Sequence, residues 1–374
     1  MEPTLIWILV SVLGGFVLAL LLGRGLVPAL RALKAGQSIR EVGPKWHQGK
    51  AGTPTMGGIV FILSSLLCIV TGWHAMRETG DYKHLLVLAL ALMFGLIGFA
   101  DDFIKVKKKR NLGLTGLQKL VLQVLAACLF LAGMHFTNAL TYDLYIPFVR
   151  EPLVHIPPLV YLALSVFIIV GCVNAVNLTD GIDGLATGVT LPVMLFFTLV
   201  SMTAKQWGLA TFPATLVGAL GGFLFYNFYP AKTFMGDTGS LTLGFLIAFF
   251  GLKFYNLNIN TDMFGIQATP AVFLGIVFIP AFDTLRVFCV RIASGLSPFY
   301  PDKRHIHHKM LRLGLTHFQS AMLIIVMQTC FIQMNVLMKN VNINLLFGID
   351  LLLGALLVWR LDRMGDRRER KGKA

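Results

Sequence analysis

The stretch FMGDTGSL, residues 234–241, carries the carboxylate whose surroundings best suit chemistry. Its acid, Asp237, lies between Gly236 and Gly239 and next to two hydroxyl residues, where a long apolar segment begins. An acidic side chain beside an apolar segment is costly unless it binds a metal ion or faces water. The two glycines allow the backbone to approach a ligand closely. The stretch therefore predicts a metal-binding or water-facing carboxylate at the end of an apolar segment.

A second acidic motif, Asp101 followed by Asp102, closes another apolar segment just before the basic run 105–110. Acids at the C-terminal end of a helix oppose its macrodipole, and two adjacent carboxylates also repel each other. A bound cation or a proton-transfer role would explain such a pair, and a plain polar helix end is the alternative. The basic run suits either membrane orientation or an anionic lipid headgroup.

The third acidic motif is NLTDGIDG, residues 177–184, in which Asp180 and Asp183 each precede a glycine. Their spacing of three residues puts both carboxylates on one face of a turn or of a first helical turn. An aspartate at a helix N-terminus is often only a cap. That interpretation accounts for one acid, but not for two acids together with their glycines and with Asn174 and Asn177. We therefore expect this motif to be functional.

Two further features suit phosphate and a nucleobase. His305, His307 and His308 lie in a loop with three Lys and Arg side chains. The HxHH spacing and the lack of a nearby cysteine do not match the usual zinc sites, so a grip on a polyphosphate is favoured over zinc. Phe234, close to Asp237, either faces lipid like most of the 29 phenylalanines or stacks on a base.

The composition indicates a membrane protein. Of 374 residues, 56% are hydrophobic and 13% are charged, which is too apolar for a soluble globular protein. Recurrent apolar runs predict an all-α, polytopic bundle of about 10–11 membrane helices. We expect a single domain, residues 1–374, with a basic cytoplasmic tail at 361–374. The expected spans are 5–30, 55–73, 85–103, 117–136, 158–176, 186–203, 209–229, 240–256, 268–292, 319–338 and 345–360.

The net charge of +14 is better explained by membrane orientation than by nucleic-acid binding, because the basic residues occupy short loops between spans. Sorting Lys and Arg by alternating loops gives one basic side, which the positive-inside rule makes cytoplasmic, with the N-terminus outside and the C-terminus inside. Every motif with chemical potential lies in a loop on this side, which predicts one active site at the cytoplasmic face. These loops are 31–56, 101–117, 177–184, 230–240 and 301–310.

The combined residue types indicate phosphate chemistry with Mg²⁺. Mg²⁺ binds through carboxylates and substrate phosphates and can neutralise a transferring phosphoryl group. The sequence has no P-loop, which disfavours an ATPase. A transporter is the main alternative to an enzyme, and it predicts acids in the middle of spans and an internal repeat. The sequence has neither feature, and a site at a bundle end suits one substrate from water and one from lipid.

Four motifs in the first two-thirds of the chain are specific in combination: residues 36–58, 101–119, 174–186 and 230–241. They resemble the polyprenyl-phosphate N-acetylhexosamine-1-phosphate transferase superfamily, and within it the phospho-N-acetylmuramoyl-pentapeptide transferase branch. The resemblance implies a Mg²⁺ enzyme of the bacterial inner membrane. That enzyme would transfer phospho-MurNAc-pentapeptide from UDP-MurNAc-pentapeptide to undecaprenyl phosphate, giving lipid I and UMP.

The last third departs from this branch. Its members usually carry three adjacent histidines and end after ten helices, whereas here SPFYPDKRHIHHKMLRLGL precedes an eleventh segment. That end resembles the branch that transfers GlcNAc-1-phosphate to a polyprenyl phosphate. A UDP-GlcNAc donor for a cell-surface glycan is therefore the alternative. In both cases the resemblance implies a UDP-sugar from the cytoplasm, a lipid phosphate from the membrane, no nucleic acid and, by analogy with relatives, a homodimer.

The resemblance also implies roles for single residues. Asp237, together with Asp180, would bind Mg²⁺, and Asp101, beside Asp102, would deprotonate the lipid phosphate. Lys119 would bind phosphate. The lipid phosphate would attack the UDP-sugar directly, and a two-step route through a phosphorylated Asp237 or Asp101 stays open. The residues implied in donor binding are Lys50, Asn177, Asp183, Asn227, Phe234, His305, His307 and His308.

Overall fold

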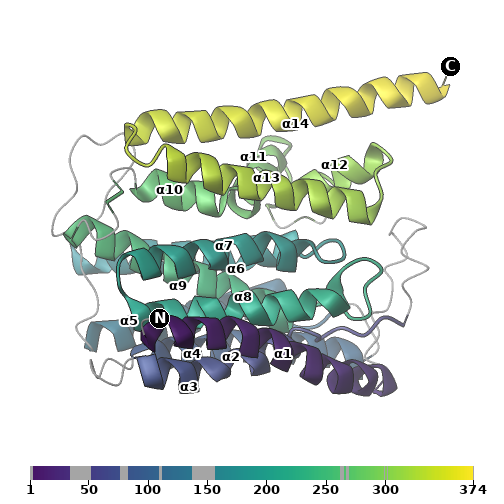
Figure 1. Ribbon diagram of the computed structural model, residues 1–374. Helices are drawn as coiled ribbons and strands as arrows, with labels where there is room; N and C mark the ends of the chain where they lie inside the picture. Colours follow the sequence, from purple (N-terminus) through teal and green to yellow (C-terminus); the bar gives the residue numbers. More distant parts are fainter. Residues whose placement is uncertain are drawn as a thin grey trace.

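The computed structural model describes residues 3–33, 52–75, 83–108, 112–136, 156–261, 265–266, 269–298, 300 and 302–373. Its helices follow one another along the chain and form a bundle (Figure 1), which confirms the predicted all-α fold. The helices are α1 (Pro3–Ala32), α2 (Ile59–Ser65), α3 (Leu67–Ala75), α4 (Lys83–Lys107), α5 (Gly116–Phe136), α6 (Pro158–Thr179), α7 (Leu185–Thr203), α8 (Trp207–Asn227), α9 (Gly236–Thr261), α10 (Thr269–Ile276), α11 (Phe278–Ala293), α12 (Ile306–Arg312), α13 (His317–Leu337) and α14 (Ile343–Lys373).

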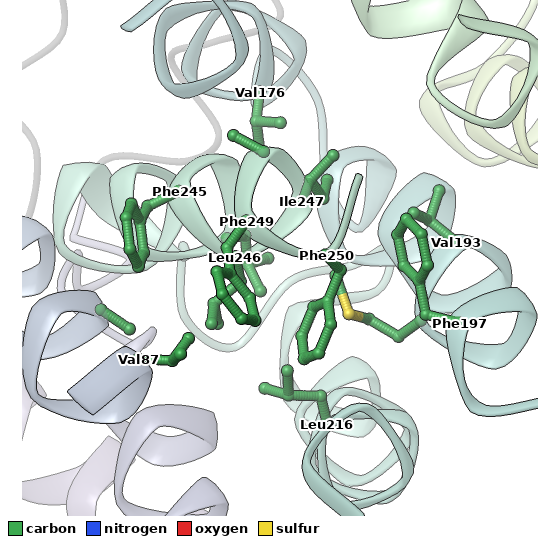
Figure 2. Close-up of a cluster of buried hydrophobic side chains, with 14 of the residues drawn as sticks. Val87, Val176, Val193, Phe197, Leu216, Phe245, Leu246, Ile247, Phe249 and Phe250 are labelled. Atoms are coloured by element: carbon green, nitrogen blue, oxygen red, sulfur yellow. The ribbon is translucent and has the colours of Figure 1, made fainter. Parts of the chain in front are cut away.

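Helix α9 is the centre of the bundle. Its most apolar window is 89% buried inside the protein, whereas that of α1 is 22% buried. Figure 2 shows side chains of α9, among them Phe245, Leu246 and Phe250, among residues of α4, α6, α7 and α8. A helix that is apolar on every face needs neighbours on all of them. The start of α9, which carries Asp237, is therefore held among the ends of other helices.

The described helices account for a multi-pass membrane protein. Nine of them are long and apolar enough to cross a membrane, and the bent pair α10–α11 would make a tenth span. Two of the eleven predicted spans are not single continuous helices. The span predicted at 55–73 is a shorter apolar segment, Ile59–His74, interrupted at Leu66, and the span predicted at 268–292 breaks at Val277.

The break between α10 and α11 bends the chain by 84° and has an identifiable cause. Pro280 has no N–H to donate to the carbonyl of Ile276, four residues earlier. The Gln328 side chain of α13 replaces that partner, because its amide donates to the Ile276 carbonyl at 2.6 Å. The Gln328 oxygen in turn accepts a hydrogen bond from the Ile279 N–H at 3.0 Å. The bend therefore places α11 so that its Asp283 reaches the start of α12.

The last helix, α14, runs without interruption from Ile343 to Lys373. The segment predicted as a basic tail, 361–374, is thus helical over its described part and continues the last span. Figure 1 places the two chain ends at opposite ends of the bundle. The C-terminal ends of α1 and α14 lie at the same end of the bundle as α12 (Figure 1). The prediction that residues 1–374, including this helix, form a single domain stays a prediction.

Candidate active site

Three carboxylates from two helices meet at the start of α9. Oxygen atoms of Asp101 and Asp102 in α4 and of Asp237 in α9 lie within 4.8 Å of one another. Asp101 and Asp102 are each only 1% exposed. The two helices approach this closely because residue 98 is a glycine: a Cβ atom at Gly98 would collide with the main-chain carbonyl of Asp237. The structure thus joins two acidic motifs that are far apart in the sequence.

Asp102 also satisfies the N-terminus of α9. Its Oδ2 accepts hydrogen bonds from the Thr238 N–H at 3.0 Å and from the Thr238 hydroxyl at 2.8 Å. The first N–H groups of a helix lack intrahelical partners and favour a nearby negative charge. Gly236 begins α9 with a φ of +73°, and a Cβ there would lie 2.5 Å from this same oxygen. Because α4 continues to Lys107, the expectation that the acid pair closes its helix is wrong.

Two lysines compensate the charge of the three carboxylates. Lys105, one turn after Asp101, lies 2.5 Å from Asp101 Oδ2 and 3.2 Å from Asp237 Oδ2. Lys119 of α5 lies 2.5 Å from Asp237 Oδ2 and 3.4 Å from Asp101 Oδ2. The motifs predicted Lys119 but not Lys105, because the basic run that contains Lys105 was interpreted as a whole, through membrane orientation or a lipid headgroup. The i, i+4 spacing from Asp101, which puts both side chains on one helix face, was the available signal.

Asn177 contacts the same acid from the end of α6. Its Nδ2 donates to Asp237 Oδ1 at 2.8 Å and to the Ser240 hydroxyl at 2.9 Å. One turn earlier, the Asn174 amide donates to Gln123 of α5 at 2.8 Å, which ties α6 to the helix that carries Lys119. Four helices, α4, α5, α6 and α9, therefore place polar groups around the single carboxylate of Asp237.

Asp180 and Asp183 lie in the turn between α6 and α7. Asp183 Oδ2 accepts a hydrogen bond from the Ala231 N–H at 3.2 Å, so this acid holds the loop before α9 against the turn. Asp180 does not belong to the three-carboxylate cluster, but the negative charge of the cluster affects its pKa. Burial, followed by the negative charges of Asp237, Asp102 and Asp183, raises the pKa of Asp180 to about 8. Without a bound cation Asp180 is therefore largely protonated at neutral pH.

Phe234 lies where two loops pair through their backbones. Its N–H and its carbonyl form hydrogen bonds of 2.8 Å each with residues 54–57, and its side chain is half-buried. Asn227 is 1% exposed, accepts from a threonine hydroxyl of α7 at 2.7 Å and donates to the Thr233 carbonyl at 3.1 Å. Asn227 thus positions this loop, and its direct contact with a ligand stays a prediction. Lys50 lies outside the described residues.

The three histidines cluster at the start of α12, against the turn that carries Asp180. His305 Nδ1 lies 2.9 Å from Asp283 Oδ2. The His307 ring packs directly on Gly181, where a Cβ atom would collide with it. The His308 ring lies 4.3 Å from that of His307, centroid to centroid. Burial, followed by the charge of His308, lowers the pKa of His307 to about 3, so this ring is neutral at physiological pH.

Asp283 was not predicted as a site residue. Besides His305, it accepts hydrogen bonds from the Ile306 N–H at 3.1 and 3.2 Å and from Arg286 at 2.7 Å. Arg286 also donates to the Arg304 carbonyl at 2.6 Å. The signal for this pair was an acid and an arginine three residues apart inside an apolar span, where charges persist when they are paired. Asp283 therefore anchors α12 to α11.

Two family models match the chain, and the longer one covers the three acidic motifs of this site. Glycosyl transferase family 4 matches residues 84–255, and phospho-N-acetylmuramoyl-pentapeptide-transferase signature 1 matches residues 50–62. The phospho-N-acetylmuramoyl-pentapeptide-transferase of Carboxydothermus hydrogenoformans is 46% identical over 247 residues, which are 65% of this chain and 74% of that protein. The chain belongs to the phospho-N-acetylmuramoyl-pentapeptide-transferase family. The enzyme of the same name from Bacillus subtilis is 46% identical over 237 residues, 63% of this chain and 72% of that protein.

Membership of this transferase family confirms the resemblance carried by the four motifs. The chain is an enzyme, a sugar-phosphate transferase, and its apolar helices make it a multi-pass membrane protein. Neither family model extends past residue 255, so α10–α14, with the histidines and Asp283, lie beyond both. The site thus has two ends. The acidic end, Asp101, Asp102 and Asp237, lies inside the matched region, and the histidine end, His305, His307 and His308, lies outside it.

The acidic end of the transferase fits a hard divalent cation. Its three carboxylates supply oxygen donors only, which ions such as Mg²⁺ prefer. Lys105 and Lys119, both within ion-pair distance of Asp237, show that the cluster already attracts positive charge. The histidine end offers the neutral ring of His307 and a paired arginine instead, next to the turn of Asp180. The arrangement can therefore hold a cation at the acidic end and a polar ligand that extends from the acidic end to the histidine end.

Proposed function

We propose that this protein transfers phospho-MurNAc-pentapeptide from UDP-MurNAc-pentapeptide to undecaprenyl phosphate, giving lipid I and UMP. The observation that carries the proposal is the convergence of Asp101, Asp102, Asp237, Lys105 and Lys119 at the ends of three packed helices of a family member. Carboxylates, ammonium groups and a helix N-terminus together suit a diphosphate and a lipid phosphate. The GlcNAc donor has less support, because the relatives that match the chain carry the muramoyl name.

In the proposed reaction an oxygen of the lipid phosphate forms a bond to the β-phosphorus of the UDP-sugar. The bond between that phosphorus and the bridging oxygen breaks, and UMP leaves with the bridging oxygen. Asp101 takes the proton of the lipid phosphate, which makes the attacking oxygen a better nucleophile. Lys105 and Lys119 bind phosphate oxygens and compensate their charge. A two-step route through a phosphorylated Asp237 or Asp101 has the same overall balance.

We assign Mg²⁺ to the acidic cluster. Asp237 would hold the ion, and Asp180 would join it once the ion displaces its proton, while Asp101 keeps its role as the base. When bound, the ion would neutralise diphosphate charge that develops during transfer. Support comes from the all-oxygen donor set and from the family, whose membership is consistent with a divalent metal.

We assign donor binding to the residues around this cluster. Phe234 offers a half-buried ring for the uracil, and Asn177 and Asp183 hold the two loops between which the donor would lie. His307 and His308 would contact the diphosphate from α12, with His305 fixed behind them by its acid. Lys50 and Asn227 complete the set as the resemblance implies it.

We place the protein in the bacterial inner membrane with the site facing the cytoplasm. Three of the five loops that carry the motifs, 31–56, 101–117 and 301–310, are rich in Lys and Arg, and the positive-inside rule assigns their side of the membrane to the cytoplasm. The positive-inside rule also assigns the C-terminal ends of α1 and α14 to the cytoplasm. Both lie at the same end of the bundle as α12 (Figure 1). Undecaprenyl phosphate would enter from the membrane and the UDP-sugar from water, and a homodimer is the assembly to test.

The test measures UMP release by protein purified in detergent with undecaprenyl phosphate and Mg²⁺. UDP-MurNAc-pentapeptide and UDP-GlcNAc are compared side by side, with Asp237→Asn as the blank. The proposal expects release with the muramoyl donor and not with UDP-GlcNAc. Release with UDP-GlcNAc alone would show that the divergent histidine end decides the sugar. No release with either donor from folded protein would overturn the transferase proposal.

A further inference from the structure

The end of α14 carries an unusual charge pattern. Residues 360–373 contain seven Lys and Arg, and among them only three acids, Asp362, Asp366 and Glu369. Intervals of four and three residues put these three acids on one face of the helix. All three form ion pairs with α12, the helix that begins with the histidines. In a basic segment, the acids thus occur only where α12 lies.

The partners on α12 form a matching pattern. Lys309 pairs with Asp362, and Arg312 pairs with Asp366 at 2.9 Å and with Glu369 at 2.8 Å. Lys309 and Arg312 are three residues apart, so they also share a face of their helix. A single exposed ion pair contributes little to stability. Two complementary stripes, however, fix the register of one helix against the other, because a shift along either axis would place like charges together.

Glycines keep the two helices close. Gly365 lies on the acidic face of α14, and a Cβ atom there would press on the Arg312 guanidinium at 3.3–3.4 Å. Gly314, just after α12, has a φ of +79° and lies directly under the Arg368 side chain. Arg368 donates a hydrogen bond to the Leu313 carbonyl, which belongs to the C-terminal end of α12. The contact therefore involves backbone as well as charged side chains.

The opposite side of α12 faces the proposed site. Its His307 ring rests on Gly181 in the turn between Asp180 and Asp183. Asp283 holds the start of the helix through His305, and the rest of the seven-residue helix α12 extends beyond that anchor. Because α14 contacts the far end, the short helix is fixed at both ends.

We propose that Asp362, Asp366 and Glu369 are positioning residues, and that the end of α14 holds α12 so that His307 meets the diphosphate of the UDP donor. The inference rests on the proposed function, since it takes a UDP-sugar as the ligand of the histidine end. It adds that the last helix, which lies outside both matched family regions, sets donor affinity through α12. None of the three acids touches the donor itself.

The test reverses the charges one side at a time. Arg312→Glu breaks two ion pairs, and the triple variant Arg312→Glu/Asp366→Arg/Glu369→Arg restores opposite charges with exchanged signs. Arg367→Glu makes the same charge change on α14 away from the acidic face and is the matched control. We expect Arg312→Glu to raise KM for UDP-MurNAc-pentapeptide about ten-fold with kcat little changed, and the triple variant to recover most of it. The control keeps the wild-type KM.

Amide hydrogen exchange of residues 306–313 supplies a readout that does not need activity. We expect faster exchange in Arg312→Glu and recovery in the triple variant. Unchanged exchange would overturn the contact between α14 and α12, and changed exchange with unchanged KM would overturn its role in donor binding. Wild-type protein that releases no UMP would instead refute the proposed function, while the exchange data would still decide whether α14 holds α12.

Discussion

The acidic end and the histidine end of the site are built in different ways. Asp101 and Asp102 are almost fully buried, and helices packed around α9 hold them close to Asp237. The histidine end depends on a short helix, α12, that is held by Asp283 on one side and by ion pairs of half-exposed or exposed side chains on the other. Both ends rest on packing, since Ile306 and Met310 of α12 are buried in an apolar cluster, but the histidine end also depends on exposed charge pairs.

This difference explains why the two ends match known proteins differently. Packing of α4 on α9 tolerates little change, since even a methyl group at Gly98 would collide with the Asp237 carbonyl. Charged pairs at a helix end can be exchanged, added or lost at small cost. The acidic end lies inside the matched family region and the histidine end lies outside it. Variation is therefore expected where exposed charge pairs add to the packing that holds the site.

The largest expected effect comes from Asp237→Asn at the acidic end. The change removes a carboxylate that faces two ammonium groups and an amide, so UMP release should fall by about 10²–10⁴-fold. Asp350→Asn is the control, because Asp350 is a fully buried acid that bonds Asn335 far from the cluster. Asp350→Asn should release UMP at about the wild-type rate per folded protein. Equal losses in both variants would show that the assay reports folding.

The second prediction tests packing at Gly98. Gly98→Ala should destabilise the protein by about 1–3 kcal/mol, because α4 must move away from α9. Gly171→Ala is the control, since a Cβ at Gly171 of α6 meets nothing within 4 Å. Thermal unfolding in detergent measures both variants. A melting temperature for Gly98→Ala equal to that of the control would show that the acidic end does not depend on this contact.

The third prediction separates the lysines from the cation. Lys119→Met should lower UMP release by about 10²-fold, because a phosphate loses its ammonium partner. The same variant should bind Mg²⁺ more tightly without substrates, since Lys119 no longer competes for Asp237 at 2.5 Å. Isothermal titration and the UMP assay measure the two effects. A loss of both activity and Mg²⁺ affinity would mean that Lys119 builds the cation site instead of competing with it.

The fourth prediction concerns Asp180, between the two ends. Its pKa of about 8 in the folded protein exceeds the usual value of about 3.9 for an unfolded chain. The folded state therefore binds more protons than the unfolded state between these values, so stability falls as pH rises from about 4 to about 8. In EDTA, Asp180→Asn should raise the melting temperature at pH 8 and leave it nearly unchanged at pH 4.

Mg²⁺ supplies the control for this pH effect. If Asp180 joins the cation site, Mg²⁺ at pH 8 should stabilise the wild-type protein more than Asp180→Asn. Equal stabilisation of both proteins would place Asp180 outside the cation site. In EDTA, a difference in melting temperature between the wild-type protein and Asp180→Asn that does not change with pH would contradict the raised pKa of Asp180.

The sequence predicted the acidic end well because its residues occur in compact motifs at the ends of long apolar runs. Asp101, Asp102, Asp237, Lys119 and Asn177 do come together. Periodicity and hydropathy could not reveal which helix ends meet, since that depends on the packing around α9. The Lys and Arg pattern put the motifs on one side of the membrane and so predicted one site, and the resemblance to a family implied which residues share it.

The histidine end was predicted less completely because its contacts connect distant, unremarkable residues. Asp283 and Arg286 looked like part of a span, and the acids of α14 looked like part of a basic tail. The break at Val277 also needs Gln328 from another helix, so Pro280 alone did not signal it. Proline also occurs inside α1, α7 and α8, where the helix continues.

The most direct test of the central claim is cation binding by the acidic cluster. Electron paramagnetic resonance would count Mn²⁺ ions bound per chain in detergent, with Mg²⁺ as competitor. Our account predicts one ion displaced by Mg²⁺ in the wild-type protein and in Asp350→Asn, and loss of that ion in Asp237→Asn. Wild-type binding of Mn²⁺ by folded Asp237→Asn would contradict the claim that Asp237 holds the cation of the acidic cluster.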